Sequence, residues 1–403
     1  MLEQNIFDIL KKRKDKVLPS SADVDALADT YINRLLTEKD KKLLGFIFKE
    51  TVSQEELDKF FENWDIEVEG GNKNLMLAYF MKMHPELKFS DYTGPRLKGL
   101  LNYYKFKNIK LLSQFSKICN KLEKEGISSL IIKGGAMKFL RPEYPRVMGD
   151  IDILVHEEDF EKAGKIVEEM GYDCDYKLHS VDLHPKGSEE GILDIHRFIN
   201  VNTGCSAALI NKNLFKRATH TKVFGVPAYV PCNEDLLFVS LMNMSRNIVE
   251  KTSVGGLFFV LFDIKFLLGS KPDFNWDIVI ENAKKTKTEV QISFMAKFIN
   301  KILPDFLPEQ MKKLIFDKQL NDWCILLAYN RLFLWGMKQR NHQLRLSTMF
   351  SSWGNFVEYI KLKPKYWLLK PFKSSPTLAK FIMGLDKKYH IVEDKYAADK
   401  FYK

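Results

Sequence analysis

Apolar residues recur with two different periods along this chain. Over most of the sequence they are spaced three or four positions apart, which is typical of amphipathic helices. Alternation with a period of two is concentrated between residues 130 and 198. The pattern predicts an α+β fold, mostly helical overall, in which helical regions at both ends flank a core containing a small mixed sheet.

One long helix is predicted directly before the alternating region. Pro95 suits the first turn of a helix, and Gly126 suits the position after its last turn. Between them, apolar residues form a single stripe: Leu97, Leu100, Leu101, Tyr104, Leu111, Leu112, Phe115, Ile118 and Leu122. We therefore expect one helix from Pro95 to about Glu125, packed along one face.

The stretch from residue 130 to residue 155 reads as a strand, a glycine turn, a short helix, a loop and a second strand. Gly134 and Gly135 follow the first strand, and paired glycines let a backbone come close to a phosphate. Asp150 and Asp152 alternate with isoleucines in the second strand, so the two carboxylates share a face, which we expect to be exposed to solvent. Their α-carbons lie about 7 Å apart, close enough to converge on a divalent cation.

A third carboxylate is predicted on a later strand. Residues 172–184 read as one strand, residues 186–191 as a turn and residues 192–198 as the returning strand. In the returning strand, Asp194 and His196 alternate with Leu193 and Ile195, so they share one face. Asp194 is therefore a candidate third ligand beside Asp150 and Asp152.

The order of these features resembles the polymerase-beta-like nucleotidyltransferase superfamily. The finer pattern, over roughly residues 94 to 270, is closest to a large bacterial family described only as uncharacterised nucleotidyltransferases. The superfamily's usual Gly-Ser pair is Gly-Gly here. The matching residues are Lys133-Gly134-Gly135-Ala136, Arg146, Gly149-Asp150-Ile151-Asp152-Ile153-Leu154-Val155, Gly171-Tyr172 and Asp194-Ile195-His196.

The resemblance implies transfer of a nucleoside monophosphate, with AMP from ATP expected, onto a hydroxyl or phosphate of an acceptor. Such chemistry uses two Mg²⁺ (or Mn²⁺) ions held by carboxylates. Asp150 and Asp152 would bridge both ions, and Asp194 would hold only the ion on the acceptor side. Lys133 and Arg146 would contact phosphate, although both also suit ordinary surface positions.

Two further polar residues have structural and functional interpretations. His196 shares the face of Asp194, so it either orients the carboxylates or touches substrate, or is a hydrogen-bonded core histidine. Asp263 lies in an otherwise apolar helix and needs a partner there. It either belongs to the active site or accepts a structural hydrogen bond from Arg246.

Other functions compete with nucleotidyl transfer. A glycosyltransferase can use D-x-D to hold Mn²⁺ and a nucleotide-sugar, but its fold needs alternating strands and helices before that motif, where this chain reads as helical. A degenerate, non-catalytic nucleotidyltransferase scaffold is a second alternative, which the retained carboxylates disfavour. A zinc site is disfavoured because His179 and His184 lie five apart, on opposite faces of one strand.

Net charge is concentrated at one end of the chain. The protein has 403 residues and a formal net charge of +10, and residues 331–403 carry all of this excess. Within residues 361–373, lysines alternate with aromatic residues and leucines. This basic C-terminal region is expected to bind an anionic membrane surface or RNA, or to be a solvated surface.

The sequence divides into four expected regions. These are an N-terminal helical region (1–93), a nucleotidyltransferase core (94–232), a helical substrate or packing domain (233–335) and the basic region (336–403). The five cysteines are widely separated, and we find neither a signal-peptide core nor a transmembrane run. We therefore expect a cytoplasmic protein, with peripheral membrane association through residues 361–403 as an alternative.

Overall fold

The computed structural model describes residues 28–308, with gaps at 30, 34, 70, 141–147, 177–179, 186–191, 200–205, 224, 251–253, 270–272, 287 and 305. Arg146, the end of the predicted helical domain (309–335) and the whole basic region (336–403) lie outside the described residues.

Along the chain, a group of helices comes first, a region of strands and helices follows, and a second group of helices comes last. The N-terminal helices are α3 (Glu38–Ile47), α4 (Gln54–Glu62), α5 (Gly71–Met83) and α6 (Thr93–Lys124). The mixed region contains β1 (Leu130–Ile132), α7 (Lys133–Leu140), β2 (Asp150–Leu154), η1 (Glu157–Asp159), α8 (Phe160–Glu169), β3 (Asp173–Tyr176), β4 (Ser180–His184), β5 (Ile192–His196), α9 (Ser206–Arg217), β6 (Thr219–Val223) and β7 (Val226–Val230). The last helices are α10 (Asn233–Glu250), α11 (Val254–Gly269), α12 (Trp276–Thr286) and α13 (Glu289–Ile302).

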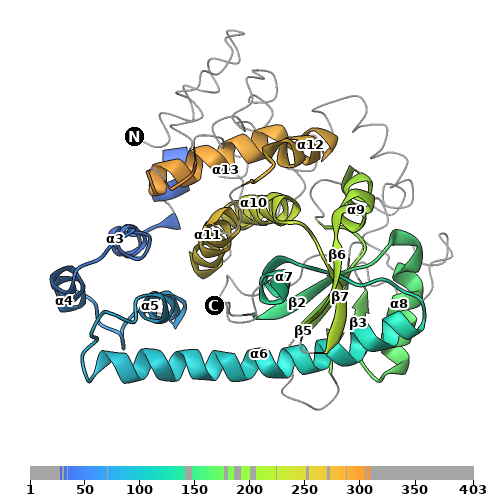
Figure 1. Ribbon diagram of the computed structural model, residues 1–403, viewed down its shortest axis with the longest axis horizontal. Coiled ribbons are helices and arrows are strands. Elements are labelled where there is room, and N and C mark those ends of the chain that lie inside the picture. Colours follow the sequence, from blue (N-terminus) through green and yellow to red (C-terminus); the bar gives the residue numbers. More distant parts are fainter. Residues whose placement is uncertain are drawn as a thin grey trace, which may run out of the picture.

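Figure 1 shows α6 running along one edge of the molecule, beneath α5 at one end and beneath the sheet at the other. Helices α10 to α13 cover the side opposite α6. A mostly helical α+β fold with a mixed sheet is therefore confirmed. The division into four regions remains a prediction, although α6 and α10 begin at Thr93 and Asn233, close to two of its boundaries.

The described strands form one seven-stranded sheet with the order β3-β4-β5-β2-β1-β7-β6. Strand β2 lies at its centre, antiparallel to β1 and parallel to β5. The alternate apolar residues of these strands are fully buried, among them Ile151, Ile153, Leu193 and Ile195. Burial of this face fixes the register, because a one-residue slip would turn these side chains to the other face.

Several helix ends follow from local sequence. Ser53 and Glu56 form a reciprocal capping box at the start of α4, as Ser-x-x-Glu predicts. Helix α6 begins two residues before Pro95 and its predicted stripe is buried or partly buried. Gly126 (φ 78°) and Gly171 (φ 94°) take left-handed conformations after α6 and α8, which explains why glycine ends both helices.

Two parts of the strand prediction were wrong. Residues 172–184 form two antiparallel strands, β3 and β4, rather than one. No Gly, Pro or Asn lies between Asp173 and His184, so the sequence gives no turn signal there. The β6–β7 hairpin was not predicted, although its turn contains Gly225 in a left-handed conformation (φ 77°).

A buried polar network joins α9 to the C-terminal helices. The Arg217 guanidinium donates to both carboxylate oxygens of Asp235, at 2.6 and 2.9 Å, and to Asn282 Oδ1 at 3.0 Å. Asn282 Nδ2 in turn donates to Asp235 at 2.7 Å. Asp235 is fully buried, so this bidentate pairing satisfies a charge that would otherwise destabilise the helical layer.

Among the described residues, no helix is both long and apolar enough to cross a membrane.

Candidate active site

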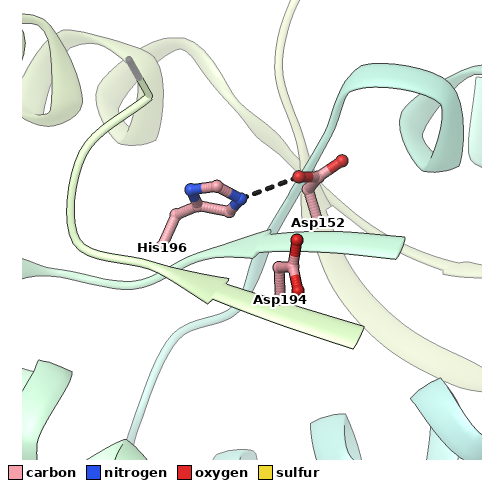
Figure 2. Close-up of side chains that lie close together, drawn as sticks. All are labelled: Asp152, Asp194 and His196. Carbon is pink, nitrogen blue, oxygen red and sulfur yellow. Dashed lines mark hydrogen bonds and ion pairs between the residues drawn. The ribbon is translucent and has the colours of Figure 1, made fainter. Parts of the chain in front are cut away.

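Asp152 and Asp194 lie directly beside each other at the centre of the sheet. Strands β2 and β5 are parallel, and their register pairs these two residues. His196 follows two positions after Asp194 on the same face of β5. Figure 2 shows both carboxylates and the imidazole converging above the two strands. The predicted shared face of Asp194 and His196 is therefore present in the fold, and Asp152 lies beside it.

The Asp152 carboxylate is buried and held by two nitrogen groups. Asp152 is only 3% exposed, so the expectation that this carboxylate lies on a solvent face was wrong. Lys133 Nζ forms an ion pair with Oδ1, and His196 Nε2 lies 2.7 Å from the same oxygen. Burial acts to raise the pKa of Asp152, but the Lys133 charge and the His196 contact outweigh it and hold this pKa well below its usual range.

Asp194 has a different electrostatic environment. Burial and the neighbouring charges of Asp152, Asp182 and Asp150 raise the pKa of Asp194 to about 8. Its Oδ1 atom is buried and accepts no hydrogen bond from the described residues. A buried carboxylate oxygen without a donor is costly, and a bound cation would satisfy it.

The carboxylates extend sideways across the sheet. The registers place Asp175, Asp182, Asp194 and Asp152 in one lateral row over β3, β4, β5 and β2. Asp182 accepts a hydrogen bond from Ser180 Oγ at 3.3 Å. Sequence reasoning missed Asp182 because it merged β3 and β4, although the alternation Ser180-Val-Asp-Leu-His184 already placed Asp182 on a polar face.

The donor set fits a divalent metal ion. One ligand atom each from Asp152, Asp194 and His196 lies within 4.8 Å of the others. Two carboxylates suit Mg²⁺ or Mn²⁺, and the open Asp194 oxygen leaves one ligand position without a competing donor. Asp150 is exposed and lies outside this group of three, but alternation places it on the same strand face as Asp152, and its charge acts on Asp194.

Helix α7 begins without the separate glycine turn that the sequence predicted. The chain changes direction at Lys133, which has a left-handed conformation (φ 55°), and α7 starts at that residue. Gly135 lies inside the helix, where an added Cβ would come 2.9 Å from Ile131 Cδ1 and 3.4 Å from Ile151 Cγ2. Close packing on β1 and β2 therefore favours glycine at this position.

Comparison with known proteins identifies the family of this chain. The family model described as uncharacterised nucleotidyltransferase matches residues 76–304, which is more than half of the chain and includes the whole candidate site.

The chain belongs to the uncharacterised nucleotidyltransferase family.

A solved structure that matches this nucleotidyltransferase family member is an antigenic nucleotidyltransferase-like protein from Paracoccidioides brasiliensis, with 15% identity and a TM-score of 0.33. The match covers 51% of this chain and 92% of the other. No curated protein matches the chain.

The remaining predicted site residues of this nucleotidyltransferase family member are placed as follows. Lys133 and His196 meet at Asp152, and Gly134 lies in the first turn of α7. Asp263 is 2% exposed in α11 and is not part of the Asp152–Asp194–His196 group. The side chain of Arg246, its predicted partner, lies outside the described residues, as does Arg146.

Proposed function

We propose that the protein is a metal-dependent nucleotidyltransferase that moves a nucleoside monophosphate, with AMP from ATP expected, onto a hydroxyl or phosphate of an acceptor. The observation that carries this proposal is the in-register pair Asp152 and Asp194, with His196 completing a group of potential ligands within 4.8 Å. This group lies inside the region that matches the family.

Asp152, Asp194 and Asp150 would hold the metal, with His196 beside them. Bound Mg²⁺ or Mn²⁺ would supply positive charge that activates the attacking oxygen and offsets the charge of the triphosphate. In the overall reaction, an acceptor oxygen forms a bond to the α-phosphorus and the bond to pyrophosphate breaks, and when the acceptor is a hydroxyl its proton is released to solvent.

Asp152 is the fixed member of the site. His196 and Lys133 both contact its Oδ1 atom, so the carboxylate is ionised and its rotamer is restrained. With the ring proton on Nε2, His196 donates to that oxygen and acts as a positioning residue. Asp152 then presents its second oxygen without having to reorganise.

Asp194 is the adjustable member of the site. Its pKa of about 8 means that the carboxyl group is largely protonated at neutral pH. The proton must leave before both oxygens are available as ligands. We propose that Asp194 gives up this proton when it serves as a ligand on the acceptor side.

Lys133 and Gly134 form the part of the site that suits phosphate. They are the first two residues of α7, where backbone amides without helical partners favour an anion. Lys133 also brings a positive charge to the same place as Asp152. We propose that Lys133, Gly134 and Arg146 contact the triphosphate, whereas Gly135 serves packing.

Mass spectrometry of products tests the proposed function. The purified protein is incubated with Mg²⁺, each of the four NTPs in turn and a lysate of candidate acceptors. We expect one acceptor to gain the mass of one nucleotide. Asp194→Asn should abolish that product, whereas Asp273→Asn, at an exposed aspartate away from the sheet, should retain it.

The non-catalytic scaffold predicts the opposite result. No nucleotide-adducted product would form in the wild-type protein with any NTP, although the fold would be intact. The glycosyltransferase alternative is disfavoured by the fold, since the described segment from residue 38 to residue 124 contains helices α3 to α6 before the first strand. A transferred sugar in place of a nucleotide would nevertheless identify it in the same experiment.

A further inference from the structure

Helix α6 has an unusually basic sequence. From Thr93 to Leu122 it contains no acidic residue. Its cations in that span are Arg96, Lys98, Lys105, Lys107, Lys110, Lys117 and Lys121. A helix on an ordinary solvated surface mixes charges of both signs, so this one-sided composition indicates a function for the charge.

Large apolar side chains are exposed among these lysines. Tyr103 is 56% exposed, Phe106 59% and Ile109 55%. At 100° per residue they fall on one side of the helix, together with Lys110 and Lys117, while Leu111, Phe115 and Ile118 lie on the other side and are buried. We call the exposed surface made by Tyr103, Phe106, Lys107, Ile109, Lys110 and Lys117 the α6 face.

All six residues of the α6 face are exposed in the described fold. In Figure 1, α5 and the sheet both lie on the same side of α6, which runs along one edge of the described fold. The rings on this face already have cations over them: Lys107 Nζ lies 5.6 Å from the Tyr103 centroid, and Lys110 Nζ lies 5.2 Å from that of Phe106.

We propose that the α6 face docks this protein on an anionic lipid surface. Apolar and aromatic side chains flanked by lysines are the composition of helices that lie in the membrane interface, with the apolar groups in the acyl boundary and the cations at the headgroups. The charge of the face is complementary to such a surface and to no basic or neutral partner.

Two observations favour lipid over the other anionic partner, nucleic acid. Base stacking uses a free ring face, and a lysine already lies over one face of each of the Tyr103 and Phe106 rings. Ile109 contributes apolar area without a π-face, which lipid accepts and a base does not. The basic C-terminal segment, residues 331–403, has the same sign of charge and is therefore not the complementary occupant.

Vesicle flotation of the full-length protein tests this proposal. Vesicles of phosphatidylcholine alone are compared with vesicles that also contain phosphatidylserine, at low and at high salt. The test variant carries Lys107→Gln, Lys110→Gln and Lys117→Gln. The matched control carries Lys42→Gln, Lys59→Gln and Lys284→Gln, which removes the same charge from exposed lysines outside the face. A third variant, Phe106→Ser with Ile109→Ser, removes apolar area and keeps the charge.

We expect wild-type protein to bind only the anionic vesicles, and to be released by salt. The α6 triple variant should bind about tenfold more weakly or worse, since each cation near an anionic leaflet contributes to binding. The control should stay within about twofold of wild type, because its charges lie away from the face. The Phe106/Ile109 variant should also bind more weakly, despite its unchanged charge.

Several results would overturn the proposal. Absence of binding by the wild-type protein to anionic vesicles at low salt is one such result. An equal loss of vesicle binding in the triple variant and in its control is another. Binding that survives the α6 variants but disappears on deletion of residues 361–403 would assign the surface to that segment instead. A parallel gel shift with RNA tests the other partner. If wild-type protein binds RNA but no vesicles, and the triple variant loses RNA binding, the α6 face is assigned to nucleic acid instead of lipid.

Discussion

Two carboxylates, Asp152 and Asp194, lie in register on adjacent strands, yet their proton affinities are displaced in opposite directions. The pKa of Asp152 is held well below its usual range, while that of Asp194 is raised to about 8. Burial acts to raise both. The difference comes from neighbours, since Lys133 and His196 contact Asp152, whereas carboxylates surround Asp194.

This contrast shows how neighbouring groups set the charge of two adjacent acidic residues. Lys133 places an internal cation against the more buried carboxylate, and the second carboxylate remains neutral by retaining a proton. The Lys133 ammonium and the proton on Asp194 each offset one negative charge in the site. A divalent cation can replace both, which is why the two positions are expected to respond differently to mutation and to metal.

The largest effect on stability is expected at Lys133. Lys133→Met should destabilise the metal-free protein by roughly 3 kcal/mol, because it leaves the Asp152 charge buried beside His196 alone. Added Mn²⁺ should restore much of the loss, since the metal supplies the missing charge. Thermal unfolding in EDTA and in Mn²⁺ measures both quantities.

Lys73 provides a matched control for this prediction. Its Nζ lies 2.9 Å from Asp40, and the exposed fractions of the two side chains, 22% and 2%, are similar to those of the Lys133–Asp152 pair. Lys73→Met should therefore also destabilise the fold, but Mn²⁺ should not restore it. Equal responses of the two variants to Mn²⁺ would contradict the assignment of Asp152 as a metal ligand.

The opposite sign is expected at Asp194. Asp194→Asn should stabilise the metal-free protein by on the order of 2 kcal/mol at pH 8. The raised pKa of Asp194 means that its ionised carboxylate destabilises the folded state relative to the unfolded chain, and the variant removes this cost. The same variant should lose the stabilisation that Mn²⁺ gives the wild-type protein. Destabilisation in EDTA would mean that Asp194 makes a favourable contact in the cation-free fold.

The pH dependence of this difference sharpens the comparison. A folded-state pKa raised to about 8 means that the folded state retains a proton that the unfolded state releases above about pH 4. Stability from Asp194 is therefore lost as pH rises from about 4 to 8, while stability from the depressed pKa of Asp152 is lost only below about pH 4. In EDTA, the advantage of Asp194→Asn should grow from pH 5 to pH 8, and a constant difference would refute the shift.

The smallest effect is expected where α7 packs on the sheet. Gly135→Ala should cost about 1 kcal/mol, because the new Cβ meets Ile131 Cδ1 at 2.9 Å. Ile131→Val removes that methyl group and should restore part of the loss in the double variant. Additive losses, measured by chemical denaturation, would show that packing against Ile131 is not the reason for glycine at this position.

The sequence was sufficient for the polar faces but not for the contacts between them. Alternation correctly placed Asp194 and His196 on one face of β5, because side-chain direction in a strand is a local property, but that β5 pairs with β2 could not be read from it. The ion pair between Lys133 and Asp152 joins residues nineteen positions apart and depends on how α7 starts. The burial of Asp152 depends on what packs over β2, and the contribution of Asp182 depends on the β3–β4 hairpin, so neither could be read from alternation alone.

The central claim is that Asp152 and Asp194 together hold a divalent metal ion. The most direct measurement is anomalous diffraction from crystals of the wild-type protein soaked with Mn²⁺, since it locates the ion without assuming any activity. We predict a peak within ligand distance of both carboxylates, which is absent from Asp194→Asn crystals soaked in the same way. Mn²⁺ located elsewhere, with no peak beside Asp152 or Asp194, would contradict the claim.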